Sequence, residues 1–102
     1  MSTLHTINKS PFEKPSLEGC LSHTTAGAAV LLIEDGVYAA MKGTRVEAAV
    51  TAALDSVKVY ALGPDLKARG CPEDRVIDGI TVVDYAGFVD LAAESTKVQA
   101  WL

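Results

Sequence analysis

Residues 28–33, Ala28-Ala29-Val30-Leu31-Leu32-Ile33, form a continuous apolar run of strand length. A strand that is apolar on both faces is typical of the centre of a parallel sheet covered by helices on each side. The turn residues Glu34-Asp35-Gly36 end the run. The run therefore predicts a central strand, around which the other elements can be placed.

Four other segments are predicted to be strands: residues 4–7, 57–62, 80–83 and, as a short fifth strand, 97–102. Helices are predicted in the segments between the strands. The first runs from near Pro15 to about Ser22, a short helix or turn covers 37–41, and further helices cover the apolar stripe 46–54, residues 63–69 and the segment after Asp84. Because strands alternate with helices, the expected fold class is α/β. We expect residues 1–102 to form a single three-layer α/β/α domain with a mainly parallel sheet of about five strands.

Three residues carry more specific local signals. Thr44, followed by Glu47, predicts a capping box in which the Thr44 hydroxyl accepts from the Glu47 backbone N–H. Asp84 stands where the N-cap of the last helix is expected. Trp101, next to the chain end, predicts that the tail docks against the domain.

Composition limits the classes of function. Nine Lys and Arg residues are scattered singly among thirteen Asp and Glu residues, giving a net charge of -4, so direct nucleic-acid binding is not expected. No apolar run approaches the ~20 residues of a membrane span, and Met1 to His5 lack the features of a signal peptide. We therefore expect a cytoplasmic protein without a membrane contact. The apolar surplus of so short a chain favours burial against partner subunits.

The sequence contains none of the common motifs for bound groups. GxGxxG and GxxxxGK[ST] are both absent, so a nucleotide site is not expected. Cys20 and Cys71 are 51 positions apart, which fits no zinc spacing, and in a reducing cytoplasm they are expected to be free thiols. No metal or organic cofactor is predicted.

Cys20 is the main candidate for chemistry. If the surrounding segment is helical, His23 lies one turn away on the same side, and a protonated imidazole there would favour the reactive thiolate. However, Leu17, Cys20 and Leu21 form an apolar set at helical spacing, and a buried cysteine behaves as a small hydrophobic residue. Both interpretations stay open at this point.

The other candidates have simpler explanations. Cys71 is followed by Glu73 and Asp74, which would raise its pKa, so an incidental surface thiol is the better interpretation. His5 on the first strand is interpreted as a structural histidine, and Glu34-Asp35 as a solvated turn rather than a site for a hard metal ion.

Four segments together resemble a known family. They are LHTINKSPFE (4–13), LLIEDGVYAA (31–40), KVYALGPDLKARG (58–70) and VVDYAGFVDLAAESTKVQAWL (82–102), and they span essentially the whole chain. In these segments the chain resembles the DsrH/TusB family. Cys20 resembles the cysteine of the DsrH branch from sulfur-oxidising bacteria, which TusB-type proteins generally lack.

The resemblance implies a function in sulfur transfer. It implies the small subunit of a cytoplasmic hetero-oligomer with DsrE-like and DsrF-like subunits, two copies of each. This complex would pass cysteine persulfide sulfur toward a DsrC-like carrier during the oxidation of stored sulfur. The main acceptor cysteine of the family belongs to the DsrE-like chain, so sulfurtransferase activity of the present chain stays undecided.

Cys20 is then one candidate persulfide carrier, with His23 as a possible support for its thiolate. Two alternatives remain open. The chain could be a non-catalytic assembly subunit of the same complex, or a TusB-like subunit of the relay that supplies sulfur for tRNA 2-thiouridine. Cys71 matches no motif of the family and receives no role.

Overall fold

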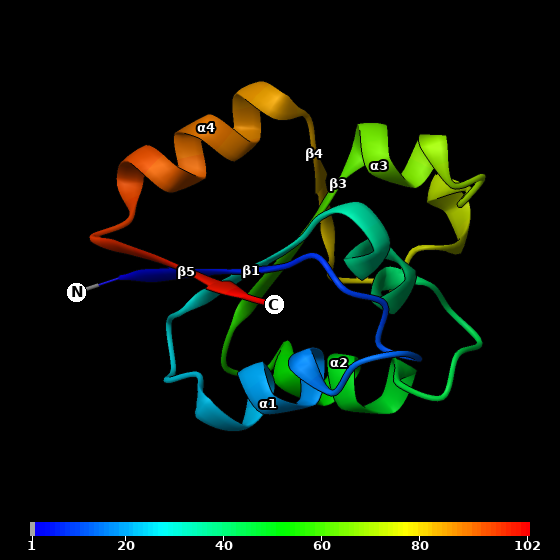
Figure 1. Ribbon diagram of the computed structural model, residues 1–102, viewed down its shortest axis with the longest axis horizontal. Helices are drawn as coiled ribbons and strands as arrows, with labels where there is room; N and C mark the ends of the chain where they lie inside the picture. Colours follow the sequence, from blue (N-terminus) through cyan, green and yellow to red (C-terminus); the bar gives the residue numbers. More distant parts are fainter. Residues whose placement is uncertain (1) are drawn as a thin grey trace.

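Strand β2 (Ala29–Leu32) lies at the centre of a five-stranded sheet in the computed structural model, which describes residues 2–102 (Figure 1). Its neighbours are β1 (Thr3–Ile7) and β3 (Lys58–Leu62), and the edges are β4 (Thr81–Val83) and β5 (Lys97–Trp101). All four strand pairs are parallel. The side chains of Val30, Leu31 and Leu32 have 0% exposure, which confirms the predicted central strand.

The order of the strands explains where the helices lie. β1, β2 and β3 follow one another across the sheet, and α1 (Ser16–His23) and α2 (Glu47–Ala53) connect them on one face (Figure 1). From β4 the chain returns to the opposite edge to form β5. Because crossover connections are right-handed, this reversal places α4 (Tyr85–Glu94) on the other face.

Short helices close the carboxyl ends of the strands. The 3-10 helix η1 (Glu34–Ala40) follows β2, and α3 (Gly63–Ala68) follows β3 directly; these two helices contact each other. A further 3-10 helix, η2 (Glu73–Arg75), lies in the segment before β4. Gly36 of η1 approaches β1 so closely that a Cβ atom there would overlap the carbonyl oxygen of Ile7.

The two faces of the sheet are covered very differently. The face under α1 and α2 holds a continuous core that includes Ile7, Leu17, Val30 and Val50, all at most 2% exposed. On the opposite face Leu4, Leu31 and Leu62 of the sheet are also buried. The helix over that face, α4, contributes no buried residue. One face is therefore fully packed, whereas the helix on the other remains largely exposed.

The predicted helix caps have different outcomes. Asp84 is the N-cap of α4, and its Oδ1 accepts from the Gly87 N–H over 2.8 Å, as predicted. The predicted bond from the Glu47 N–H to the Thr44 hydroxyl is wrong. The Thr44 hydroxyl accepts instead from the Val46 N–H over 3.3 Å, because the chain turns here and α2 begins only at Glu47. The Glu47 carboxylate reaches the Gly43 N–H over 2.7 Å.

Among residues 2–102 the longest helix is α4, with 10 residues. The described part of the chain therefore has no helix of the length and apolarity needed to cross a membrane.

Candidate functional site

Cys20 lies on the inner face of α1 and is completely buried. It belongs to the apolar core that packs α1 against the sheet, together with Leu17 of the same helix. Burial raises the pKa of the Cys20 thiol to about 11, because the thiolate would lose its hydration. At neutral pH the side chain is therefore a protonated thiol, out of reach of solvent.

His23 is exposed and lies at the last residue of α1. Its Nδ1 is 2.8 Å from the Gly19 carbonyl oxygen, which can only accept, so Nδ1 carries a proton and donates. Among residues 2–102 no hydrogen bond joins His23 to Cys20. The two side chains therefore do not meet as predicted. Cys20 points into the core, whereas His23 bonds the backbone of its own helix at the surface.

Trp101 of β5 fixes α1 to the edge of the sheet. Its ring centroid lies 6.1 Å from that of His5 on β1 and 6.2 Å from that of His23 on α1. Its Nε1 donates a hydrogen bond to Nδ1 of His5 over 3.0 Å. A Cβ atom at Gly19 would be 3.7 Å from the indole, so the ring lies against the backbone of α1. The predicted docking of the tail is confirmed.

The second thiol, Cys71, is half-buried in the segment after α3. Burial raises its pKa, and the charge of Arg69 acts in the opposite direction. The direction agrees with the sequence prediction, although the cause is burial rather than the acidic neighbours. Cys71 borders an open groove of about 600 Å³, lined by Gly63, Pro64, Lys67, Cys71, Pro72 and Glu73. It is the more accessible of the two thiols.

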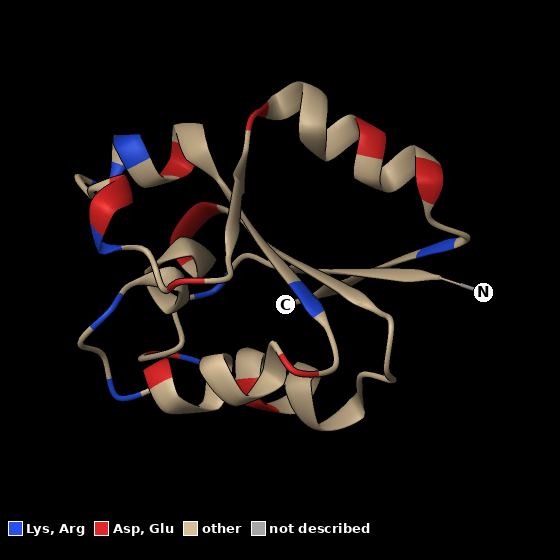
Figure 2. Cartoon of the chain, turned by 180° about the vertical axis from the view of Figure 1, so that it is seen from behind, with Lys and Arg blue, Asp and Glu red and all other residues tan. Residues whose placement is uncertain are grey.

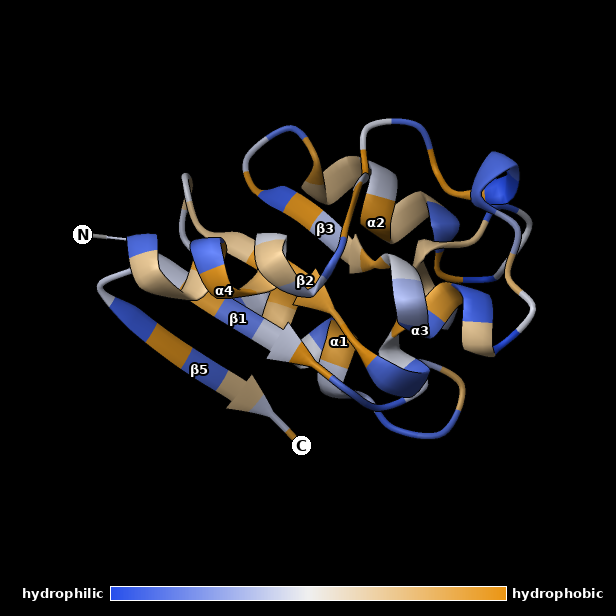
Figure 3. Ribbon diagram, turned by 90° about the horizontal axis from the view of Figure 1, so that it is seen from above, coloured by the Kyte–Doolittle hydropathy of each residue, from blue (hydrophilic) through white to orange (hydrophobic). Residues whose placement is uncertain are grey.

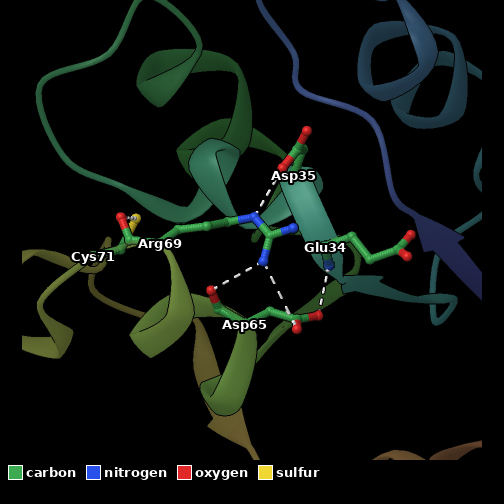
Figure 4. Close-up of polar contacts among 5 residues, drawn as sticks. All are labelled: Glu34, Asp35, Asp65, Arg69 and Cys71. Carbon is green, nitrogen blue, oxygen red and sulfur yellow. Dashed lines mark hydrogen bonds and ion pairs between the residues drawn. The ribbon is translucent and has the colours of Figure 1, made fainter.

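A cluster of charged residues joins η1 to α3 (Figure 4). Nε of Arg69 donates to Oδ1 of Asp35 over 2.8 Å, and Nη1 lies 3.9 Å from Oδ1 of Asp65. Oδ2 of Asp65 accepts from the Glu34 N–H over 2.6 Å. Glu34 has a φ of 50°, in the left-handed region that non-glycine residues rarely adopt. The carboxylate of Asp65 thus holds a strained turn at the end of β2.

This cluster has little capacity for an anionic ligand. Arg69 lies between two carboxylates, and the hydrogen bond that it donates to Asp35 is the main cause that raises the pKa of Arg69. Its charge is therefore compensated within the domain. Among residues 2–102 no group of three or more His, Cys, Asp or Glu side chains is arranged to hold a metal ion.

Sequence reasoning missed the contacts of Arg69 and Asp65 and the one between Trp101 and His5. The spacing of Asp65 and Arg69 is i, i+4 on a helix, a signal from which their contact could have been inferred. The hydrogen bond between Trp101 and His5 joins residues 96 positions apart and has no local signal. It depends on β5 pairing with β1, which only the strand order reveals.

The fold and the sites define a class of protein: a small α/β/α domain with a fully parallel five-stranded sheet. Solved structures share this fold. A protein of unknown function from Methanobacterium thermoautotrophicum matches with a TM-score of 0.80 at 16% identity, covering 96% of this chain and 97% of that one. The ychN protein of E. coli matches with a TM-score of 0.78 at 18% identity, covering 98% and 99%.

Sequence comparison shows the family. The model described as "DsrH like protein" matches residues 9–98, and the chain belongs to this family. It is 35% identical to a protein named TusB from Pectobacterium parmentieri, over 96% of this chain and 99% of the relative. It is 37% identical to a protein named TusB from Escherichia coli O1:K1, with the same coverage. The resemblance to the DsrH/TusB family is confirmed.

Proposed function

We propose that this chain is a subunit of a hetero-oligomeric sulfur relay, in which it supports assembly while the acceptor cysteine belongs to a partner chain. The observation that carries the assembly role is the complete burial of Cys20. A thiol reacts as its thiolate, and a pKa of about 11 leaves almost none at neutral pH. The partners proposed are a DsrE-like and a DsrF-like subunit, two copies of each, which deliver sulfur to a DsrC-like carrier.

The chemistry of such a relay needs no cofactor. A thiolate attacks the outer sulfur of a donor persulfide, a new S–S bond forms, and the donor leaves as a thiolate. The receiving persulfide later loses its outer sulfur to the next thiolate in the same way. The number of S–S bonds is unchanged at each step, so no oxidant or reductant is consumed.

Cys20 as a persulfide carrier is the second form of this proposal. In that form α1 must move away from the sheet before the thiol can react, because Cys20 lies in the core. The Trp101 indole and the bond from the Ser16 hydroxyl to the Leu102 carbonyl oxygen, 3.2 Å long, oppose that movement. His23 would support the thiolate only after this rearrangement, because its Nδ1–H is bonded to Gly19.

Two pathways are candidates for the relay. The presence of Cys20 favours the oxidation of stored sulfur, on the resemblance to the DsrH branch. The names of the relatives from Pectobacterium and Escherichia favour the TusB-type alternative, in which the sulfur reaches tRNA.

The test is a sulfur-loading experiment on the purified complex. After incubation with a persulfide donor, intact-mass spectrometry should find an added sulfur atom on a partner chain and none on this one. A Cys20→Ser complex should assemble and transfer sulfur at the wild-type rate, with Cys71→Ser as the matched control. An added sulfur on Cys20 would support the carrier form instead. Failure of the chain to assemble with either partner would reject the proposed function.

A further inference from the structure

The outer face of α4 is apolar and has no packing partner among residues 2–102. Tyr85 is 60% exposed and Val89 is 65% exposed, and Ala86 and Ala93 are exposed beside them. At 100° per residue these four side chains fall within an arc of roughly 100°, the width of the stripe by which a helix normally packs onto a core. This stripe, Tyr85, Ala86, Val89 and Ala93, is called here the outer stripe.

The outer stripe extends the apolar side of α4 beyond the residues that face the sheet. Leu91 and Phe88 are half-buried and lie on the sheet side of the helix, and half-buried Ala92 lies between Phe88 and Tyr85 at the edge of the outer stripe. Figure 3 shows α4 running over the sheet as a single helix with nothing above it. The apolar face of α4 is thus wider than the part that packs on the sheet, and the outer stripe is the part left exposed. An apolar stripe that is exposed along the whole length of a helix marks an interaction surface.

The charge around the outer stripe is of one sign. Between residues 76 and 96 the chain has four acidic residues and no Lys or Arg, so this segment has a charge of -4. The rest of the chain has nine acidic and nine basic residues, so the segment accounts for the whole net charge of -4. On α4 the acidic residues are Asp90 and Glu94, with Asp84 at its N-terminal end; Figure 2 shows these red positions and no blue one on the helix. No ion pair involves any of these three carboxylates among residues 2–102.

This charge decides which partner fits. Two copies of the chain packed through α4 would bring their carboxylates together with no cation between them, which disfavours self-association. An anionic lipid surface is disfavoured for the same reason. A protein segment with an apolar strip bordered by Lys or Arg would satisfy both the stripe and the carboxylates.

We propose that the outer stripe of α4 docks a basic amphipathic segment of a different protein chain. The inference rests on the proposed function only in its choice of natural partner, which is one of the two other subunits of the relay. Tyr85 and Val89 supply the apolar contact at the centre, and Asp90 and Glu94 supply ion pairs at its border. These ion pairs mainly determine which partner binds and how fast the two proteins associate, and they contribute less to the affinity.

The first experiment uses synthetic helical peptides as probes of the isolated full chain. A fluorescent peptide with a leucine stripe bordered by lysines should bind, and the same peptide with glutamates in place of lysines should bind at least about tenfold more weakly. A scrambled peptide of the leucine-lysine composition should also bind more weakly, by about fivefold, because it has no continuous stripe. Equal binding of the scrambled peptide would overturn the proposal, since charge alone would then explain the interaction.

Variants place the binding on α4. Val89→Lys should weaken binding of the leucine-lysine peptide by about tenfold or more, and Asp90→Asn with Glu94→Gln by about threefold. Leu102→Ser is the matched control, because Leu102 is an 81% exposed apolar residue outside α4. No loss in Val89→Lys, or an equal loss in Leu102→Ser, would contradict the proposal. So would a wild-type dimer in light scattering that Val89→Lys dissociates, because the occupant would then be a second copy.

Hydrogen exchange in the natural complex provides an independent test of the docking site. When the chain is co-purified with the DsrE-like and DsrF-like subunits, amides of α4 should exchange hydrogen more slowly than in the chain alone. A complex that forms without protection of α4 would refute the docking site and leave the proposed function intact. If no complex forms while the peptide results hold, the proposed function fails and the docking site stands.

Discussion

Nε1 of Trp101 lies 3.0 Å from Nδ1 of His5 and donates a hydrogen bond to it, so β5 is tied to β1 by side chains as well as by backbone pairing. The bond requires that Nδ1 of His5 be unprotonated. Burial, with a smaller contribution from Lys97, lowers the pKa of His5 below its usual 6.5. The stability of the sheet edge is therefore linked to pH through one histidine.

Thermal stability should fall as the pH is lowered through the range below 6.5. The folded-state pKa of His5 is lower than its unfolded-state pKa, so the unfolded chain takes up the proton first and stability is lost as the pH falls. One such group contributes a loss of at most about 1.4 kcal/mol per pH unit. Melting temperatures at pH 7.5 and 5.5 should differ less in His5→Gln than in wild type.

Replacing Trp101 by Phe should destabilise the fold by about 1–3 kcal/mol. The substitution keeps an aromatic ring against α1 but leaves Nδ1 of buried His5 without its donor. Urea denaturation followed by circular dichroism measures the change. An unchanged unfolding free energy would show that water replaces the indole at no cost, and the proposed pH link would then lose its structural basis.

Most of the elements could be predicted because their signals are local. The apolar run 28–33, the N-cap residue Asp84 and the alternation of strands with helices are each contained in a short stretch. The geometry at Thr44 was predicted wrongly, because the hydroxyl had two backbone N–H groups within reach and the turn decided between them. The strand order, and with it the exposure of α4, depends on pairing between distant segments.

The candidate site was less predictable than the fold. Cys20 and Leu17 were correctly described as part of an apolar set, but spacing alone could not decide between a buried and a reactive thiol. The decision depends on how deeply α1 packs on the sheet, and Trp101 at the far end of the chain helps to determine that.

The two thiols should differ in their rate of alkylation. Cys71 is half-buried and borders an open groove, whereas Cys20 is fully buried with a pKa of about 11. With iodoacetamide at pH 8, peptide mass spectrometry should find Cys71 modified at least about tenfold faster than Cys20. Cys20 should become reactive only in denaturant, and a Cys71→Ser chain should be inert under native conditions. Equal rates for the two thiols would mean that α1 opens readily.

Two glycines should respond in opposite ways to replacement by alanine. A Cβ at Gly36 would overlap the Ile7 carbonyl oxygen, which is backbone and cannot move aside, so Gly36→Ala should cost at least about 3 kcal/mol. A Cβ at Gly19 would be in ordinary contact with Trp101 at 3.7 Å, and alanine favours the helix by up to about 1 kcal/mol. Gly19→Ala should therefore be neutral or stabilising. Chemical denaturation of both variants measures the contrast.

The carboxylates that flank Arg69 should contribute unequally to stability. Asp65, with a side-chain exposure of 17%, also accepts the Glu34 N–H over 2.6 Å, so Asp65→Ala leaves that turn without its acceptor and should cost about 1.5–3 kcal/mol. Asp35 is 53% exposed and bonds only Arg69 among the described residues, so Asp35→Ala should cost no more than about 1 kcal/mol. High salt should reduce the second cost, because it screens an exposed ion pair, and leave most of the first. Urea denaturation at low and high salt separates the two effects. Equal costs with equal salt dependence would mean that the cluster acts through charge alone, and that Asp65 does not hold the strained turn at Glu34.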